Sequence, residues 1–257
     1  MTAARQLTLQ ALSGIPMVQA GDDLCALIRE ALARDALTLE DGDVLVLAQK
    51  IVSKSEGRTV RLSQVAPSER ARVLADAVGK DPRLVELVLQ ESNEVVRYRR
   101  DVLVVEHRSG FVMANAGIDM SNVLQDDEDP SALLLPQDAD SSCAALREAL
   151  RAALDVDVGI VINDSHGRAW RNGTVGVAIG VAGLPGVQDL RGSPDLFGRK
   201  LLITEVGLAD EIAAAASLLM GQAAEGAPVV RVRGLAWPRR PGRAAELVRP
   251  RQMDMFR

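Results

Sequence analysis

The chain alternates between short apolar runs and longer stretches in which apolar residues recur every three or four positions. Apolar runs of roughly four to eight residues are typical of strands, and the wider spacing is typical of amphipathic helices. We expect strands at residues 7–12, 43–48, 101–106, 111–114, 158–162, 174–183, 201–206 and 229–232. We expect helices at residues 24–32, 67–89 (a helical pair), 141–154 and 209–220. This order predicts an α/β or mixed α+β fold with mixed strand pairing.

Two of the expected strands run into segments that are rich in side-chain oxygen atoms. NAGIDMSN (115–122) follows the hairpin, and NDSHGR (163–168) follows the second buried strand. Within them, Asp119 and Asp164 each have neighbours with hydroxyl or amide side chains. Ser165, for example, directly follows Asp164. Oxygen-only ligand sets suit Mg²⁺ or Mn²⁺ and do not suit zinc. Turns made of Asp, Ser and Asn are also common after strands, so the pattern leaves both a shared metal site and two ordinary turns open.

Basic residues lie near the same strand ends. Lys50, Lys54 and Arg58 follow the first buried strand, and Arg168 and Arg171 lie in and just after the second polar segment. Cations at such positions can hold phosphate or carboxylate groups. A solvated surface explains them equally well.

The histidines add little to the picture. His107 lies beside the hairpin turn, where we expect it to be exposed, and His166 is either a turn residue or a substrate contact. Ser165 and His166 are adjacent, so their side chains diverge on an extended backbone, which disfavours a serine-hydrolase dyad.

Standard nucleotide-binding motifs are absent from the sequence. Gly79-Lys80 lacks the preceding glycine and following hydroxyl of a phosphate-binding loop, and Gly176, Gly180 and Gly183 have the wrong intervals for a dinucleotide fingerprint. A nucleotide, if one binds, is held in another way.

Composition narrows the function classes. The 257 residues are 47% hydrophobic and carry a net charge of −5 with only six aromatic residues, which argues against nucleic-acid binding. Cys25 and Cys143 stand far apart without nearby ligands, which fits a reducing compartment and no thiolate zinc site. The longest apolar stretch, 175–187, is broken by glycines and is too short to span a bilayer. We find no signal-peptide pattern and expect a cytoplasmic protein that does not bind membranes.

Eight segments, in order from about residue 13 to residue 235, together resemble the coenzyme F420-0:γ-glutamyl ligase family. They are GIPMVQAGDDL (14–24), DGDVLVLAQKIVSKSEGR (41–58), PSERA (67–71), NAGIDMSNV (115–123), LLLPQDADSS (133–142), DSHGRAWRNGTVGVAIGVAG (164–183), DLFGR (195–199) and ADEIAAAASLLMGQ (209–222). The resemblance implies a family-specific mixed fold that is neither Walker-type nor ATP-grasp. It also implies a homodimer that uses GTP, Mg²⁺ or Mn²⁺, and K⁺. We assign residues 1–237 to the ligase domain, as one unit or two intertwined subdomains, and residues 238–257 to a C-terminal extension.

The resemblance also assigns roles to individual residues. By position, Asp119 resembles the first metal ligand, Asp164 and Ser165 the second metal pair, and Asn122 a nucleotide contact. Ser165 stands where the family usually has Thr and keeps the hydroxyl. The expected GTP contacts are Gly14, Ile15, Pro16, Met17, Lys54, Asn122, Met220, Gly221 and Gln222. After Gln222 a richer glycine run of the family is replaced by residues 223–226.

The implied reaction adds L-glutamate to coenzyme F420-0 or a close variant. The acceptor carboxylate first takes the γ-phosphoryl group of GTP, and the glutamate amine then displaces phosphate from the acyl phosphate. Lys54 is the expected phosphate-reaching catalytic residue, and Arg168 and Arg171 are candidates for holding the glutamate carboxylates or the phosphodiester of the acceptor. A metal-dependent phosphohydrolase and a noncatalytic nucleotide-binding dimer are the alternatives.

Overall fold

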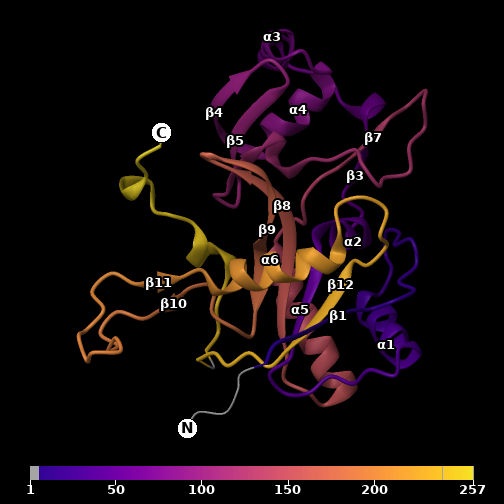
Figure 1. Ribbon diagram of the computed structural model, residues 1–257. Coiled ribbons are helices and arrows are strands. Elements are labelled where there is room, and N and C mark those ends of the chain that lie inside the picture. The colour runs from indigo at the N-terminus through magenta and orange to yellow at the C-terminus, as the bar shows by residue number, and fades with distance from the viewer. Residues whose placement is uncertain (1–5, 239, 257) are drawn as a thin grey trace.

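A five-stranded mixed sheet runs through the larger part of the molecule (Figure 1). The computed structural model describes residues 6–238 and 240–256. The strand order is β1-β12-β2-β8-β9, in which β2 and β8 are parallel and the other neighbours antiparallel. The strands are β1 (Thr8–Ala11), β2 (Val44–Ala48), β8 (Gly159–Arg168), β9 (Arg171–Ala182) and β12 (Val229–Arg233). The predicted mixed α+β class is confirmed.

Helices cover both faces of this sheet, and that is why its central strands are apolar on both sides. Leu45, Leu47 and Ile160 lie in one core with α1 (Leu24–Arg34) and α5 (Ala139–Leu154). The alternate residues Val44, Val46 and Val161 lie in a second core with α6 (Leu208–Met220). The expected helix start near residue 24 is confirmed, because the Asp23 carboxylate accepts hydrogen bonds from the first amides of α1.

A smaller unit with its own apolar core lies at one end of the sheet, at the top of Figure 1. Its strands form a three-stranded antiparallel sheet and a separate two-stranded pair, packed with the predicted helical pair. The elements are β3 (Thr59–Arg61), α3 (Glu69–Val78), α4 (Pro82–Gln90), β4 (Ser92–Arg99), β5 (Val102–His107), β6 (Val112–Ala114) and β7 (Ser131–Leu133). The chain therefore leaves the main sheet after β2 and returns to it at α5.

The structure corrects several of our element predictions. The strand expected at 201–206 is wrong except for β11 (Glu205–Val206), which pairs with β10 (Gln188–Asp189) in an extended arm. Helix α2 (Gln49–Ser55) and strands β3, β4 and β7 were not predicted. Helix α2 begins directly from β2 at Ala48 without a side-chain cap, so the sequence lacks the usual start signal.

Strand β8 is longer than its apolar run suggested. Residues 163–168 continue the ladder with β9 as far as Arg168, so the polar segment is part of the strand and does not follow it. The ladder shifts register between Ile162 and Asn163, at the point where the strand changes from apolar to polar. Irregularities of this kind redirect side chains and are often found beside functional sites.

The predicted exposure of His107 is wrong. The side chain is 2% exposed because the hairpin turn packs against the end of α4, where the Arg108 amide donates to the Glu91 carbonyl. The buried Glu91 carboxylate lies 2.8 Å from Arg58 Nη2 and 2.7 Å from Arg108 Nη2. His107 Nε2 is 3.8 Å away, too far for a hydrogen bond, while Nδ1 accepts from the Ser109 amide. Glu91 therefore joins α4, the hairpin and the start of β3.

The C-terminal segment is not wholly an exposed extension. Ala244 is buried against α6 and the main sheet, and its amide donates to the Asp140 carboxylate at 2.9 Å. Glu246 pairs with Arg240 at 2.8 Å and accepts from the Val187 amide. Residues 1–5 of the expected ligase domain, and residues 239 and 257 of the extension, lie outside the described residues. Across the described ranges, no helix has the length and apolarity to cross a bilayer.

We predict that Glu91→Gln lowers the free energy of unfolding by about 3 kcal/mol, because removing one charge of a buried pair leaves the other charges uncompensated. Chemical denaturation of wild type and variant measures the difference. Glu30→Gln, at an exposed position on α1, is the control and should change stability little.

The interaction of Glu91 with its cationic neighbours also makes the stability of the protein depend on pH. Burial alone would raise the pKa of Glu91, but the charges of Arg58 and Arg108 lower it overall from its ordinary 4.5. A carboxylate with a lowered folded-state pKa stabilises fully above the unfolded value, and this contribution is lost as pH falls. The stability gap between wild type and Glu91→Gln should therefore shrink below pH 4.5. A gap independent of pH would contradict this account.

Candidate functional site

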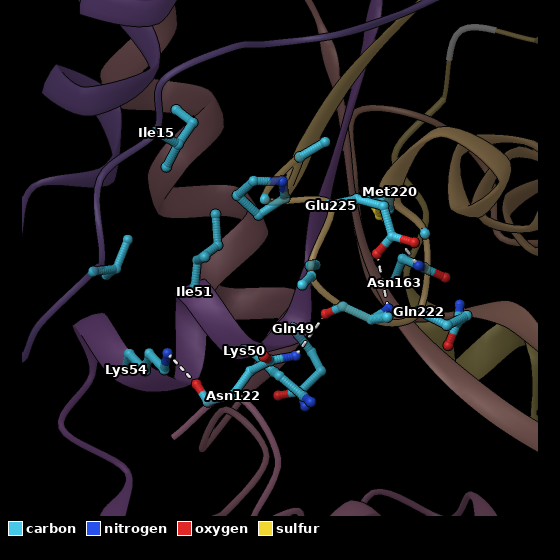
Figure 2. A pocket seen from close by; sticks show the side chains of 18 of the residues that line it. Ile15, Gln49, Lys50, Ile51, Lys54, Asn122, Asn163, Met220, Gln222 and Glu225 are labelled. Carbon is cyan, nitrogen blue, oxygen red and sulfur yellow. Dashed lines mark hydrogen bonds between the residues drawn. The ribbon is translucent and has the colours of Figure 1, made fainter. Parts of the chain in front are cut away.

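A cavity of about 390 Å³ opens where the main sheet meets the smaller unit (Figure 2). A volume of this size is in the range of small-molecule sites. Its walls come from segments far apart in the sequence: the loop before α1, the helix α2, residue 122, strand β8 and the loop after α6. The lining residues are Ile15, Pro16, Met17, Val18, Ala48, Gln49, Lys50, Ile51, Lys54, Asn122, Asn163, Asp164, Ser165 and residues 220–228.

Helix α2 places two cations beside the cavity. Lys50 and Lys54 are four residues apart, so they lie on the same face of the helix. Lys50 Nζ lies 2.7 Å from Asp119 Oδ2 and 2.7 Å from Ser121 Oγ. Lys54 Nζ donates to the Asn122 carbonyl at 2.6 Å. Burial, and secondarily the nearby Lys50 charge, lowers the pKa of Lys54.

Residues 119–122 form a tight turn that both lysines hold. Asp119 accepts from the Ser121 amide at 2.7 Å and from the Ser121 hydroxyl at 2.9 Å. Burial alone would raise the pKa of Asp119, but the bonds from Lys50 and Ser121 lower it overall, so the carboxylate is ionised. Asn122 takes the left-handed conformation (φ 54°) and donates to the Ala223 carbonyl at 3.1 Å. The turn thereby links α2 to the loop after α6.

The polar half of β8 forms another wall. Asn163 is buried, with its amide nitrogen 3.4 Å from Met220 Sδ, and its Oδ1 has no hydrogen-bond partner in the described part of the chain. Ser165 donates to Gln222 Oε1 at 2.7 Å, and Asp164 is 3.1 Å from His166 Nε2. Side chains alternate along a strand, so Asp164 and His166 share one face of it.

Glycine 176 on β9 permits the close approach of Asn163. A Cβ atom at Gly176 would lie 2.5 Å from Asn163 Oδ1 and 2.6 Å from the Ala213 carbonyl oxygen. Both contacts are shorter than side chains tolerate, so a larger residue there would displace the cavity wall.

Most of the residues that the sequence singled out meet at this cavity. Those that line it are Ile15, Pro16, Met17, Lys54, Asn122, Asp164, Ser165, Met220, Gly221 and Gln222. Gly14 lies next to the wall, against Arg34, and Asp119 is connected to the wall through Lys50. Arg168 and Arg171 lie at the exposed end of the β8–β9 hairpin, where Arg168 donates to the Gly173 carbonyl, and they are not among the lining residues.

Sequence reasoning missed several lining residues, among them Gln49, Asn163 and Glu225. The four-residue spacing of Lys50 and Lys54 would have indicated that they share one face of a helix, but only if α2 had been predicted. Nothing in the local sequence distinguishes Asn163 or Glu225 from ordinary polar residues, because their positions depend on tertiary contacts.

The donor atoms near the cavity suit a hard cation that is bound together with a substrate. Within residues 6–238 and 240–256, no three His, Cys, Asp or Glu side chains gather as a metal site. The oxygen atoms of Asp119, Asp164 and Ser165 are the donor type that Mg²⁺ and Mn²⁺ prefer, and Mg²⁺ commonly takes one or two carboxylates plus phosphates and water. Since the Lys50 ammonium neutralises Asp119, a metal ion at Asp119 would have to share that carboxylate with it.

Comparison with known proteins places this chain in a family. The family model for F420-0:Gamma-glutamyl ligase matches residues 14–234. Relatives named coenzyme F420:L-glutamate ligase include those of Methanothermobacter thermautotrophicus, 47% identical over 98% of this chain and 99% of the relative, and Methanopyrus kandleri, 45% identical over 93% of both. The relative from Archaeoglobus fulgidus is 43% identical over 95% of this chain and 94% of its own length. The chain belongs to the F420-0:γ-glutamyl ligase family.

Proposed function

We propose that this protein is a GTP-dependent ligase that joins L-glutamate through an amide bond to coenzyme F420-0 or a close variant. The relatives that share 40–47% of its residues carry the name coenzyme F420:L-glutamate ligase. The observation that carries the proposal is the cavity itself, where two lysines, a left-handed Asn122 and the oxygen atoms of β8 meet at residues that the family resemblance assigns to GTP and metal.

In this proposal Lys54 of α2 holds the phosphates of GTP. Lys54 is partly buried and bonds only a neutral carbonyl among the contacts described, so its charge is available to a phosphate oxygen. Lys50 is already paired with Asp119 and orients the 119–122 turn. Positioning and charge neutralisation are the main needs of phosphoryl transfer, and this arrangement supplies both.

Asp119, Asp164 and Ser165 would hold Mg²⁺ or Mn²⁺. The ion would neutralise charge on the phosphates and on the acceptor carboxylate. We propose the use of K⁺ on the basis of the family resemblance alone. His166 donates to Asp164 through Nε2 when that nitrogen carries the proton, which keeps the carboxylate oriented.

The chemistry then proceeds in two balanced steps. An oxygen of the acceptor carboxylate attacks the γ-phosphorus, the bond to the β–γ bridging oxygen breaks, and GDP leaves. The glutamate amine attacks the carbonyl carbon of the acyl phosphate, gives up a proton, and inorganic phosphate leaves. Arg168 and Arg171, at the end of the hairpin, remain our candidates for binding carboxylates or the phosphodiester outside the cavity.

A homodimer is part of the proposal. The β10–β11 arm extends from the body of the molecule (Figure 1) and exposes the large apolar side chains Leu196, Phe197, Leu202 and Ile203. Apolar patches of this kind are usually buried in an interface, and a second copy of the chain would bury them here.

We predict that Lys54→Ala raises the KM for GTP by on the order of 10- to 100-fold, because a charge-assisted hydrogen bond to phosphate is lost. Steady-state kinetics with saturating L-glutamate and F420-0 measure the effect. Lys80→Ala, in the turn between α3 and α4, is the matched control. Equal effects at both positions would remove Lys54 from the phosphate site.

We predict that Asp119→Asn and Asp164→Asn each lower turnover about 100-fold or more, because metal charge stabilisation is worth several kcal/mol. Ser165→Ala should lower it less, since a neutral ligand contributes less than a charged one. Electron paramagnetic resonance of Mn²⁺ with GDP reports the metal affinity independently of activity. Asp76→Asn, on the exposed face of α3, is the control, and unchanged Mn²⁺ binding in both site variants would exclude these carboxylates as ligands.

We predict that hydroxylamine replaces glutamate and traps the acyl phosphate as a hydroxamate, with GDP formed in equal amount. Mass spectrometry after incubation with GTP, Mg²⁺ and F420-0 detects the product, and addition of a glutamyl unit in the parallel reaction tests the ligase activity itself. GDP release that needs no acceptor would favour a phosphohydrolase. Normal glutamate addition without any hydroxamate, under conditions where hydroxylamine does not inhibit, would contradict the acyl phosphate.

A further inference from the structure

Trp170 is an exposed aromatic side chain at the tip of the β8–β9 hairpin. The residue is 87% exposed, so its ring contributes almost nothing to the core. Its backbone takes the left-handed conformation, with φ 65°, which is unfavourable for a residue with a bulky side chain. Neither burial nor backbone preference therefore accounts for a tryptophan at this position.

A second aromatic ring, from the C-terminal segment, lies beside Trp170. The ring centroids of Trp170 and Phe256 are 6.3 Å apart, and their planes are inclined at 56°. Phe256 is 54% exposed, so the contact leaves ring surface of both residues open to solvent. The Arg251 guanidinium donates to the Glu94 carboxylate on β4 at 2.9 Å. This bond holds the end of the chain beside the smaller unit, on the side where the tip of the hairpin lies (Figure 1).

Two cations flank the exposed tryptophan. Arg168 and Arg171 pair with each other across the turn that carries Trp170, and both are exposed. Among its described contacts, Arg168 donates to the neutral Gly173 carbonyl at 2.9 Å. An indole face can stack on a flat aromatic ring, and guanidinium groups bind phosphate or carboxylate oxygen atoms. The hairpin tip therefore has the chemistry to bind an aromatic anion.

Strand β8 connects this tip to the cavity. Ser165 lines the cavity, and the strand continues from there to Arg168, about 10 Å at the usual rise of a strand. Gly167 lies on the same face of the strand as Ser165, because successive positions alternate between the faces. A Cβ atom at Gly167 would meet no other atom within 4 Å. The strand therefore presents a bare, open surface between the cavity and the hairpin tip.

We propose that the acceptor of the glutamate lies along this surface, with a flat aromatic ring against Trp170 and its anionic groups near Arg168 and Arg171. The inference rests on the proposed function, which places the reacting carboxylate at the polar part of β8. Neither of the other two substrates fits the hairpin tip, because glutamate has no ring and the nucleotide is held in the cavity. Trp170 is then a residue that selects the acceptor, with Phe256 beside it.

The first test changes the ring of Trp170. Trp170→Ala should raise the KM for F420-0 on the order of 10-fold, because an aromatic stacking contact is lost, and should leave the KM for GTP unchanged. Trp170→Phe keeps a flat ring and should restore most of the loss. Steady-state kinetics, with one substrate varied while the others saturate, separate the two constants. Thermal unfolding of each variant checks that it is folded.

Two further variants separate ligand binding from structure. Gly167→Val places a side chain in open space and introduces a residue type that strands favour, so the unfolding temperature should not fall. The KM for F420-0 should nevertheless rise, because the path along β8 is obstructed, while the KM for GTP stays the same. Val73→Ala removes an exposed apolar side chain from α3. It is the control and should leave both KM values at their wild-type level.

An unchanged KM for F420-0 in folded Trp170→Ala would overturn the inference and leave the ligase proposal standing. If that variant also sedimented as a smaller species than wild type, the hairpin tip would be a contact between copies of the chain. Equal rises in the KM for GTP and for F420-0 would overturn the inference as well. Absence of glutamate addition to F420-0 by wild type would instead contradict the proposed function and, with it, this inference.

Discussion

The ion pair between Lys50 and Asp119, 2.7 Å long, is the interaction on which the rest of the candidate site depends. Lys50 belongs to α2, which begins directly after β2 of the main sheet, and Asp119 lies in the smaller unit between β6 and β7. Their pairing fixes the 119–122 turn against α2, which lets Asn122 reach the loop after α6. Removing one partner of a partly desolvated pair leaves the other uncompensated, so the cavity wall and its charge depend on both.

The arrangement also shows how a cavity lined by charged and polar side chains is built from separate segments, in a chain that has no standard nucleotide motif. Cations come from one helix, side-chain oxygen atoms from a strand that continues beyond its apolar part, and a carboxylate from a glycine-bounded loop. The bulge beside Asn163 and the missing side chain at Gly176 bring the strand and α6 close together. These elements meet because the main sheet pairs β2 and β8 in parallel, so both strands run to the same edge.

Sequence reasoning recovered the parts of the fold whose signal is local. Strands β2 and β8 were predictable as apolar runs because both of their faces are buried. Asp23 indicated the start of α1. Helix α2 has no capping side chain, and β4 carries mostly polar residues, so neither was foreseen. In the candidate site, the family resemblance singled out Lys54, Asn122 and Gln222, and all three line the cavity. Asn163 and Glu225 were missed because a glycine on another segment or a loop conformation places them, and neither leaves a local pattern.

A crystal structure of the protein with GDP and Mn²⁺, with anomalous data collected for manganese, tests the central claim most directly. The account predicts GDP bound in this cavity with its phosphates against Lys54, and an anomalous peak at the oxygen atoms of Asp119, Asp164 or Ser165. Nucleotide density outside this cavity, or manganese bound away from all three of these side chains, would contradict it.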